Sequence, residues 1–447
     1  MKDGTWADRG GRHGVGSRLT PLLAACILVS WIAAPVAAVD VYLDIKSSGS
    51  RRIDVAVPRF STGEESIRAL ETGEQIRSIL MYDLLNSSVF NPIDISPFFA
   101  SEGVEASSIN FKQWYLIGMQ ALVAGTFTFH GDEIILKAWI YDVPMGQEII
   151  GKSYQGQIAQ LREMVHRLSD EMVFRFTGEQ GVARTRIAFV KAVAGIKEIM
   201  LMDYDGHNMI PITSDGTLSL FPALTGDGTR LAYTSYRHGN PDLLLIELRD
   251  KTVSTLASGG MNITPAFDAA GTHLAFSREI DGNPEICTMD LMGSNLQRLT
   301  FYPGIDSSPD WSPNGRQLVF TSDRSGSPQL WTMDVEGGNQ RRLTFIGEYN
   351  DGAAWSPRGD RIAFHSRQNG AFEICLINPD GSHFTQVTND LGSCETPAWS
   401  PDGRQLIFSV RKGGTTTLMR LQLQTGRLSD IGTPGRNEDW TAPCWSR

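Results

Sequence analysis

A repeat of about 44 residues constrains the fold of this chain more than any other feature of its sequence. Five units begin with similar stretches, for example SPDWSPNGRQLVFTS from Ser308 and TPAWSPDGRQLIFSV from Thr396. The apolar or aromatic anchors of these units are spaced 43, 44, 44 and 44 residues apart; they are Leu224, Phe267, Trp311, Trp355 and Trp399. A period of this size is typical of propeller blades or of helical repeats.

The pattern within each unit favours the propeller. Apolar, β-branched and aromatic residues alternate with polar ones, which is typical of half-buried strands. Asn314-Gly315 and Asp402-Gly403 separate the first two strands, and we expect both residues of each pair to take the positive φ of a two-residue hairpin. A third strand follows, as in PEICTMDL, and a fourth contains RRLT or TQVT. Each unit therefore predicts one four-stranded blade.

The two ends of the repeat region complement each other. Trp445 follows Trp399 by 46 residues, so the segment TAPCWSR supplies an innermost strand without its partners. The stretch that starts with TRIAFV at Thr185 instead begins at a second strand, with Phe189 lying 44 residues before Tyr233. The last strand therefore completes the first blade, and residues 183–447 are predicted to form a six-bladed all-β propeller closed by an N/C-terminal strand clasp. Such closure removes open sheet edges.

Residues 39–182 lack the repeat and predict a small N-terminal α/β domain, which makes the fold multidomain. VDVYLDI and RRIDVAVPRF are expected to form strands, and helices are expected near residues 66–85, 111–119 and 158–176. Two alternating segments flank His130-Gly131-Asp132 as a hairpin, and Gly178 is expected to end the last helix.

Residues 1–38 have the pattern of a secretory signal peptide. Positively charged residues precede an apolar stretch that ends in small residues, which predicts cleavage after Ala38. A membrane anchor is a weaker interpretation, because the apolar run is shorter than the roughly 20 residues needed to span a membrane. A lipoprotein cleavage site is also a weaker interpretation, because Cys26 lies inside the apolar run instead of after it. We expect an exported soluble protein. Its formal net charge of −10, without a Lys/Arg cluster, argues against a nucleic-acid partner.

Four cysteines follow this segment. Cys287 and Cys375 occupy the same repeat position and are expected to be buried as small apolar residues. Cys394 and Cys444 can pair only if neighbouring repeats bring them together, and the sequence leaves this open.

Motifs of catalysis are missing from the sequence. It contains no G-x-S-x-G, H-E-x-x-H or P-loop, and no G-x-G-x-x-G after a strand, so no enzymatic activity, cofactor or metal is predicted.

His166 is expected on a helix surface and His273 on a solvated strand, and His365 replaces a Ser or Thr of other units. A carboxylate or amide recurs once per unit, and we expect it to form hydrogen bonds between strands or blades; these residues are Glu198, Asp242, Glu285, Gln329 and Glu373.

The loops that lead into the innermost strands should gather around one mouth of the propeller channel. They combine apolar, amide and acidic side chains, which suits a protein or peptide ligand with basic or polar tips. The candidate partner-binding residues on these loops are Met261, Asn262, Asp306, Ser307, Asn350, Asp351, Glu395, Glu438 and Asp439. The alternatives are a solvated ring of loops without a partner, and an exported polysaccharide lyase or hydrolase, which would need histidine, arginine and acids in the channel.

The chain resembles the TolB family of the Tol–Pal envelope system in Gram-negative bacteria. TRIAFV at the start of the propeller, MDYDGHN in the first blade and the TPAWSPDG repeats are similar to those of the family, as is the order of signal peptide, α/β domain and propeller. Blade starts such as LTGDG and DAAG depart from the SPDG pattern.

The resemblance implies a monomeric periplasmic binding protein that reaches membranes only through its partners. It implies that the mouth binds Pal, the peptidoglycan-associated lipoprotein, through loops centred on Met261, Asn262, Thr264 and Ser307. It also implies that an N-terminal segment binds the C-terminal domain of TolA; this segment is Asp40, Val41, Tyr42, Leu43, Asp44, Ile45, Lys46 and Ser47. The implied role is outer-membrane integrity and invagination during cell division. Where the loops have diverged, a scaffold for another lipoprotein remains an alternative.

Overall fold

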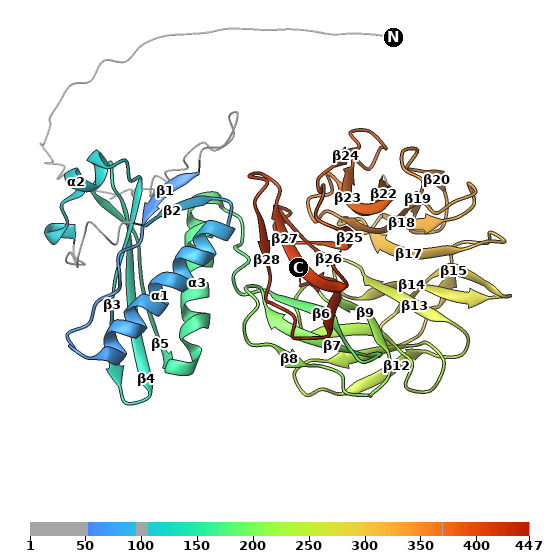
Figure 1. Cartoon of the computed structure of the whole chain (residues 1–447), viewed down its shortest axis with the longest axis horizontal. Helices are drawn as coiled ribbons and strands as arrows, with labels where there is room; N and C mark the ends of the chain where they lie inside the picture. Colours follow the sequence, from blue (N-terminus) through green and yellow to red (C-terminus); the bar gives the residue numbers. More distant parts are fainter. Residues whose placement is uncertain (1–51, 95–105, 369, 447) are drawn as a thin grey trace, which may run out of the picture. The chain divides into compact units, whose positions relative to one another are not determined.

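The computed structural model describes residues 52–94, 106–368 and 370–446, and all of these belong to one compact unit (Figure 1). The predicted signal peptide, including Ala38, and the segment from Asp40 to Ser47 lie outside the described residues. None of the described helices has the length and apolar character that a membrane crossing requires.

The N-terminal region is built on a five-stranded sheet of order β2-β1-β3-β4-β5. The short strand β1 (Ile53–Ala56) lies parallel to β2 (Phe90–Ile93) and to β3. The strands β3 (Ala121–His130), β4 (Glu133–Asp142) and β5 (Gln147–Gln157) form an antiparallel meander. The sequence predicted β1 and the β3–β4 hairpin but not β2 and β5.

Helices cover both faces of this sheet. The helix α1 (Ile67–Asn86), whose first turn is capped by the Ser66 hydroxyl, and α3 (Leu161–Thr177) pack their apolar residues on one face. The short helix α2 (Phe111–Leu116) packs Trp114 against the opposite face, and two 3-10 turns, η1 (Ala106–Ser108) and η2 (Ile158–Gln160), complete the domain. Gly178 ends α3 with a φ of 73°, as the sequence predicted. The second helix is shorter than predicted because the chain turns at Gly118, with a φ of 88°.

The rest of the chain forms six four-stranded antiparallel sheets, which confirms the predicted six-bladed propeller. Blade 1 contains β29 (Glu438–Trp445), β6 (Arg186–Val193), β7 (Ile196–Asp203) and β8 (Ile210–Pro211); blade 2 contains β9 (Ser219–Leu224), β10 (Arg230–Ser235), β11 (Asp242–Glu247) and β12 (Val253–Ala257); blade 3 contains β13 (Asn262–Phe267), β14 (His273–Ile280), β15 (Asn283–Asp290) and β16 (Gln297–Arg298). Blade 4 contains β17 (Asp306–Trp311), β18 (Gln317–Ser322), β19 (Gln329–Asp334) and β20 (Arg341–Arg342); blade 5 contains β21 (Asn350–Trp355), β22 (Ile362–Gln368), β23 (Ala371–Ile377) and β24 (Thr385–Gln386); blade 6 contains β25 (Ser393–Trp399), β26 (Gln405–Lys412), β27 (Thr415–Gln422) and β28 (Leu428–Asp430).

One aromatic ring per blade forms the repeated core. It occupies the same position on the second strand of each sheet and is fully buried; these residues are Phe189, Tyr233, Phe276, Phe320, Phe364 and Phe408. Each ring packs against aliphatic side chains of the preceding blade: Tyr233 lies in one apolar cluster with Ile199 and Leu201 of blade 1. In the same way, Phe320 lies in one cluster with Ile286 and Leu299 of blade 3. The same contact recurs from blade to blade, which explains why the period of the sequence is so regular.

The clasp closes blade 1. The strand β29 pairs with β6 from Glu438 opposite Val193 to Trp445 opposite Ile187, so the red C-terminal strand lies beside the green β6 (Figure 1). Trp445 is 3% exposed, and its indole N–H donates to the Thr185 hydroxyl at 2.7 Å. The first and last strands of the propeller thus share one sheet, as the sequence predicted.

The turns between first and second strands differ from the prediction. Five residues, 312–316, separate β17 from β18, so the turn is not a two-residue hairpin. Only Gly315 has a positive φ, 68°, whereas the Asn314 side-chain oxygen accepts hydrogen bonds from the Ser312 hydroxyl and the Arg316 N–H. Asn and Asp therefore serve these turns as hydrogen-bond acceptors.

Four of the five recurring carboxylates and amides have the structural role that the sequence predicted, whereas Asp242 lies 3.2 Å from the imidazole of His238 instead. Gln329 accepts a hydrogen bond from the Thr344 hydroxyl at 2.9 Å, and that hydroxyl also accepts from the Leu330 N–H at 2.9 Å. Glu198, Glu285 and Glu373 hold the threonine of their own blade in the same way. Each pair ties the third strand to the chain just beyond the fourth.

Among the described residues, Cys287, Cys375 and Cys394 are free thiols. Cys287 and Cys375 are buried, as predicted, and burial raises the pKa of the Cys287 thiol to about 11 and that of Cys375 to about 12. The thiol of Cys444 accepts a hydrogen bond from the Leu224 N–H at 3.2 Å and is not paired with Cys394.

Candidate functional site

Each innermost strand bends at the same place through a β-bulge. One residue of β9, β13, β17, β21, β25 and β29 has a φ between 48° and 62°, and the register to the second strand shifts there; these residues are Phe221, Thr264, Ser308, Gly352, Thr396 and Ala442. A bulge bends its strand and redirects side chains. The residues before the bulges belong to the mouth loops, and those after them line the channel.

The channel end beyond the bulges is lined mainly by residues without charged side chains. A cavity of about 200 Å³ is lined there by proline, alanine and aromatic residues from all six blades. Asp268 and Asp310 are its acidic side chains, and its lining contains no histidine, arginine or lysine. The Asp310 carboxylate accepts the Trp355 backbone N–H of the next blade at 2.7 Å.

Three of the predicted partner-binding residues are buried at the mouth. Asn262, Asp306 and Asn350 start β13, β17 and β21 and have no exposed surface. The Asn350 amide donates to the Ile346 carbonyl at 2.9 Å, the Asn262 amide donates to the Gly259 carbonyl at 3.2 Å, and Asp306 pairs with Arg324 at 2.6 Å. These side chains fix the shape of the mouth loops.

The other predicted residues are half-buried around the mouth. Asp351 accepts from the Thr321 hydroxyl at 2.7 Å, and Glu395 accepts from the Ser393 hydroxyl at 3.0 Å. Glu438 pairs with Lys191 at 2.7 Å, which lowers the pKa of its carboxyl group. Asp439 accepts the Thr416 N–H. Met261, Thr264 and Ser307 complete the half-buried set, so the mouth combines acids with neutral side chains.

Blade 5 departs from the other blades at the mouth. His365 replaces the serine or threonine of other blades and lies over Gly352, where a Cβ atom would come within 2.8 Å of the imidazole. Its ring stacks on Tyr349, with centroids 6.5 Å apart and planes at 24°. Burial lowers the pKa of His365, although Asp351 and Glu395 oppose this shift. The imidazole is therefore neutral at pH 7.

Substituting Gly352 tests this arrangement. Gly352→Ala should destabilise the chain by about 1–3 kcal/mol, because alanine at positive φ is strained and its Cβ would collide with His365. Gly338→Ala is the matched control, since a Cβ there meets nothing within 4 Å. The measurement is thermal unfolding by circular dichroism, and equal melting temperatures for the two variants would contradict the expectation.

The prediction that His166 lies on a helix surface was wrong. His166 is 3% exposed, and its ring nitrogens lie 2.8 Å from the Asp83 carboxylate on α1 and 3.4 Å from the Asp205 carboxylate after β7. Arg162 also pairs with Asp205, and the Tyr204 hydroxyl donates to Asp83. This buried polar network connects the α/β domain to blade 1.

The electrostatics of the network favour a charged imidazole. Burial by itself would lower the pKa of His166, but hydrogen bonds to Asp205 and Asp83 outweigh it and raise the pKa to about 9. Burial would raise the pKa of Asp205, but His166 and Arg162 hold it well below its usual value. His166 is therefore an imidazolium beside the Asp205 carboxylate at pH 7, whereas burial raises the pKa of Asp83.

A buried arginine continues this interface toward the clasp. Arg420 on β27 has no exposed surface and lies over the rings of Tyr204 and Trp445, at 5.1 and 5.5 Å from their centroids. It donates to the Tyr82 hydroxyl at 3.2 Å and to the Tyr204 carbonyl. Sequence reasoning missed this residue, because nothing in its own strand distinguishes it from a surface arginine.

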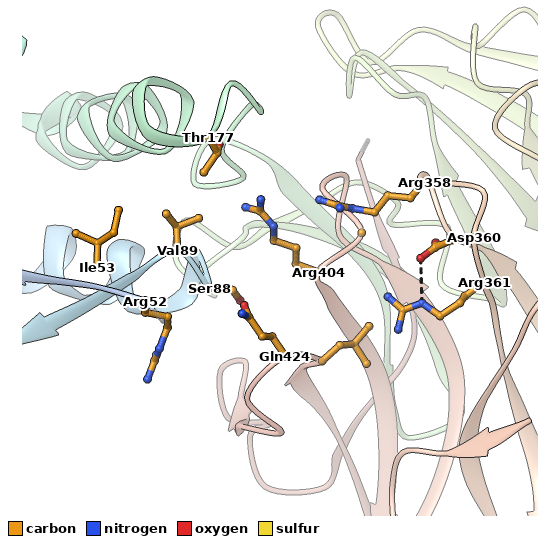
Figure 2. A pocket seen from close by; sticks show the side chains of 12 residues that line it. Arg52, Ile53, Ser88, Val89, Thr177, Arg358, Asp360, Arg361, Arg404 and Gln424 are labelled. Atoms are coloured by element: carbon orange, nitrogen blue, oxygen red, sulfur yellow. Dashed lines mark hydrogen bonds and ion pairs between the residues drawn. The ribbon is translucent and has the colours of Figure 1, made fainter. Parts of the chain in front are cut away.

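Arginines also line a pocket of about 330 Å³, shown in Figure 2. Arg358 and Arg404 come from the first turns of blades 5 and 6, and both donate to the Glu179 carboxylate, at 2.8 and 2.6 Å. Arg361 pairs with Asp360 at 3.2 Å, as the dashed line shows (Figure 2). The two ion pairs of Glu179 connect the segment after α3 to the ends of the innermost strands that lie away from the mouth.

Two family models match the chain. Residues 173–447 match the TolB beta propeller domain, and residues 41–149 match the TolB amino-terminal domain. The first match alone covers more than half of the chain. The chain belongs to the TolB family.

Curated relatives in the TolB family share about a third of their aligned residues with this chain. The Tol-Pal system protein TolB of Desulfosudis oleivorans is 34% identical over 236 residues, which cover 51% of this chain and 53% of the relative. The protein of the same name from Geobacter metallireducens is 37% identical over 208 residues, which cover 46% of this chain and 48% of the relative. These alignments span about half the length of the relatives.

A solved TolB structure shows the same fold over a greater length. TolB from Acinetobacter baumannii superposes with a TM-score of 0.77 and 25% sequence identity, covering 91% of this chain and 99% of that chain. The similarity includes both the α/β region and the six-bladed propeller.

Proposed function

We propose that this TolB-family chain is a periplasmic, non-enzymatic binding component of the Tol–Pal system. In this proposal its propeller mouth binds Pal and its segment from Asp40 to Ser47 binds the C-terminal domain of TolA. It would thereby support outer-membrane integrity and invagination during cell division. The names of the curated relatives support membership of the system.

The construction of the mouth is the observation that carries the proposal. Buried side chains such as Asn262 and Asn350 fix the loops, so a partner would meet a preformed surface. Preformed surfaces lose less conformational entropy on binding. Contacts with the α/β domain, such as those of Glu179 with Arg358 and Arg404, lie at the other end of the innermost strands. The mouth is thus spatially separate from that interface.

The alternatives have less support. A propeller lyase or hydrolase needs clustered acids, bases and cations, whereas the lining of the channel end has two carboxylates and no histidine, arginine or lysine. A scaffold for another lipoprotein would use the same mouth, so the test below must use the Pal domain of the same organism.

Calorimetric titration of residues 39–447 with the Pal periplasmic domain tests the proposal. We expect saturable 1:1 binding that Met261→Arg and Ser307→Trp each weaken about tenfold or more, because both side chains are half-buried in the mouth. Thr385→Trp, exposed on the outermost strand of blade 5, is the matched control and should leave the affinity unchanged.

A chain that starts at residue 48 separates the two proposed sites. It should bind Pal as the longer chain does and should no longer bind the TolA C-terminal domain. The absence of Pal binding by the unsubstituted chain would refute the proposed function, and retained TolA binding by the shortened chain would refute the role of the N-terminal segment.

A further inference from the structure

Four large apolar side chains are exposed on one side of the propeller mouth. Phe301 and Ile305 are 71% and 50% exposed, and Phe345 and Ile346 are 74% and 54% exposed. They lie on two equivalent loops of neighbouring blades, from β16 to β17 and from β20 to β21. We call these four residues the rim platform. Exposed apolar groups gathered in this way often mark interaction sites.

The same four-residue motif, Arg-Leu-Thr-Phe, positions both phenyl rings. The Arg298 Nε–H donates to the Thr300 carbonyl at 2.8 Å, and its guanidinium lies 4.5 Å from the Phe301 ring centroid. In the next blade, the Arg342 Nε–H donates to the Thr344 carbonyl at 2.6 Å, and the guanidinium lies 4.8 Å from the Phe345 ring centroid. Each ring is held by a cation while most of its surface stays open to solvent.

Folding of the blade does not require these rings. In blade 5, the Gln386 side-chain amide donates to the Thr388 carbonyl at 2.8 Å, so the same backbone contact forms without an arginine. Asn389 occupies the position of Phe301 and Phe345 there and is exposed. Since a polar residue serves the fold equally well, the exposed phenylalanines of the other two loops need another explanation, and binding supplies one.

The two arginines differ in their charge partners. Arg298 pairs with the buried Glu285 at 2.7 Å and with Asp281 at 3.5 Å. Blade 4 has the neutral Gln329 where blade 3 has Glu285, and among the described residues no carboxylate pairs with Arg342. The half-buried guanidinium of Arg342 is therefore available to an incoming carboxylate.

The platform is continuous with the mouth loops of the proposed function. Ile305 directly precedes Asp306, and the carbonyl of Ile346 accepts the hydrogen bond of the Asn350 amide at 2.9 Å. The acids Asp351 and Glu395 follow on blades 5 and 6. Charge thus changes along the mouth, from the cation Arg342 beside apolar groups to carboxylates.

We propose that the rim platform receives an apolar side chain of the protein that docks at the mouth, with a carboxylate of that protein paired to Arg342. This inference rests on the proposed function, in which the docking protein is Pal. Aromatic and arginine side chains dominate the binding free energy of protein interfaces. Because Phe301 and Phe345 are already held in place by arginines, they lose little rotamer freedom when the partner binds.

Titration of the Pal periplasmic domain into residues 39–447 and their variants tests this inference. Phe301→Ala, Phe345→Ala and Arg342→Glu should each raise the dissociation constant about tenfold or more, as expected of central interface residues. Asn389→Ala, at the equivalent position of blade 5, is the matched control and should stay within about twofold. Since Phe301, Phe345 and Asn389 are exposed, the melting temperatures of their variants should remain those of the unsubstituted chain.

The outcomes separate this inference from the proposed function. If the unsubstituted chain binds Pal and the two phenylalanine variants bind equally well, the platform is refuted and the proposed function stands. If the unsubstituted chain does not bind Pal, the proposed function and the platform fail together. For Arg342→Glu, a loss of affinity that is restored by replacing one acidic residue of Pal with lysine would identify the paired carboxylate.

Discussion

A chain that lacks residues 437–447 should lose the cooperative unfolding transition of its propeller. This deletion removes β29, which leaves the inner edge of β6 unpaired and uncovers the core around Phe189 and Arg420. An unpaired edge and an exposed core are both costly, and the ring can no longer close. The measurement is thermal unfolding by calorimetry, and superimposable curves for the two chains would refute the clasp.

The single substitution Trp445→Ala should weaken the clasp without removing its strand. It should cost roughly 3–5 kcal/mol, the range for truncating a buried tryptophan, and it also removes the hydrogen bond to Thr185. Trp399→Ala is the matched substitution within an unbroken blade, because Trp399 is also buried and donates to the Ala354 carbonyl at 2.9 Å.

A rescue experiment isolates the closing strand from the loss of one side chain. A synthetic peptide of residues 437–447 should raise the melting temperature of the deleted chain as its concentration rises, because it binds only the folded state. A peptide of the same composition in scrambled order should have no effect. The same peptide should not affect Trp399→Ala, in which β29 is already present.

The free energy of unfolding should fall as the pH rises from about 6.5 to about 9, because of His166. In this window the folded chain keeps the proton of His166 whereas the unfolded chain releases it, so stability decreases with pH. The slope from this residue is about 1.4 kcal/mol per pH unit, or roughly 3 kcal/mol across the window. The stabilisation by His166 is fully present below the pKa of His166 in the unfolded chain, and it is lost above the pKa of His166 in the folded chain.

The variant His166→Gln identifies the source of this slope. The groups that face His166 are Asp83 of α1, Asp205 and Tyr204 of blade 1, and Arg162 of its own helix. Glutamine keeps a polar side chain among them but does not titrate, so its stability curve should lack the added slope. His273→Gln is the control, since His273 is exposed. Parallel curves for His166→Gln and the unsubstituted chain would refute the assignment.

The sequence predicted the propeller well because its information is local and repeated. The anchors Trp311, Trp355 and Trp399 recur at a fixed period, and each blade pairs strands that are neighbours in the chain. The sequence did not predict the length of the turns between the first and second strands. Asn314-Gly315 has the composition of a tight hairpin, and only the positions of the strand ends show that five residues separate the strands.

Contacts between distant segments were beyond sequence reasoning. His166 lies among charged residues on α3, and nothing in its helix shows that Asp205 of blade 1 lies beside it. The motif MDYDGHN supplied Tyr204 and Asp205, yet its partners Asp83 and Arg162 come from separate helices. Burial of a charged group depends on what packs against it, and that is a property of the assembled fold.

At the mouth, position in the repeat was predictable but exposure was not. Asn262 and Asn350 were selected because they precede the innermost strands, and the structure places them there with their side chains turned into the loops. Phe301 and Phe345 were overlooked because a phenylalanine after a strand resembles a core residue. The repeated Arg-Leu-Thr-Phe motif, in which leucine and threonine are buried, is the signal that separates them from the core.

The sharing of blade 1 between the two ends of the propeller has a kinetic consequence. Blades 2 to 6 are built from consecutive strands, so their hairpins can form early and independently of one another. The hydrogen bond between Ser446 and Arg186 instead joins residues 260 positions apart. The entropy of closing so long a loop must be lost before the contacts of blade 1 form, which makes ring closure the slow, late step of folding. Mechanical or thermal opening should therefore begin at this one seam, while the other blades still hold their strands.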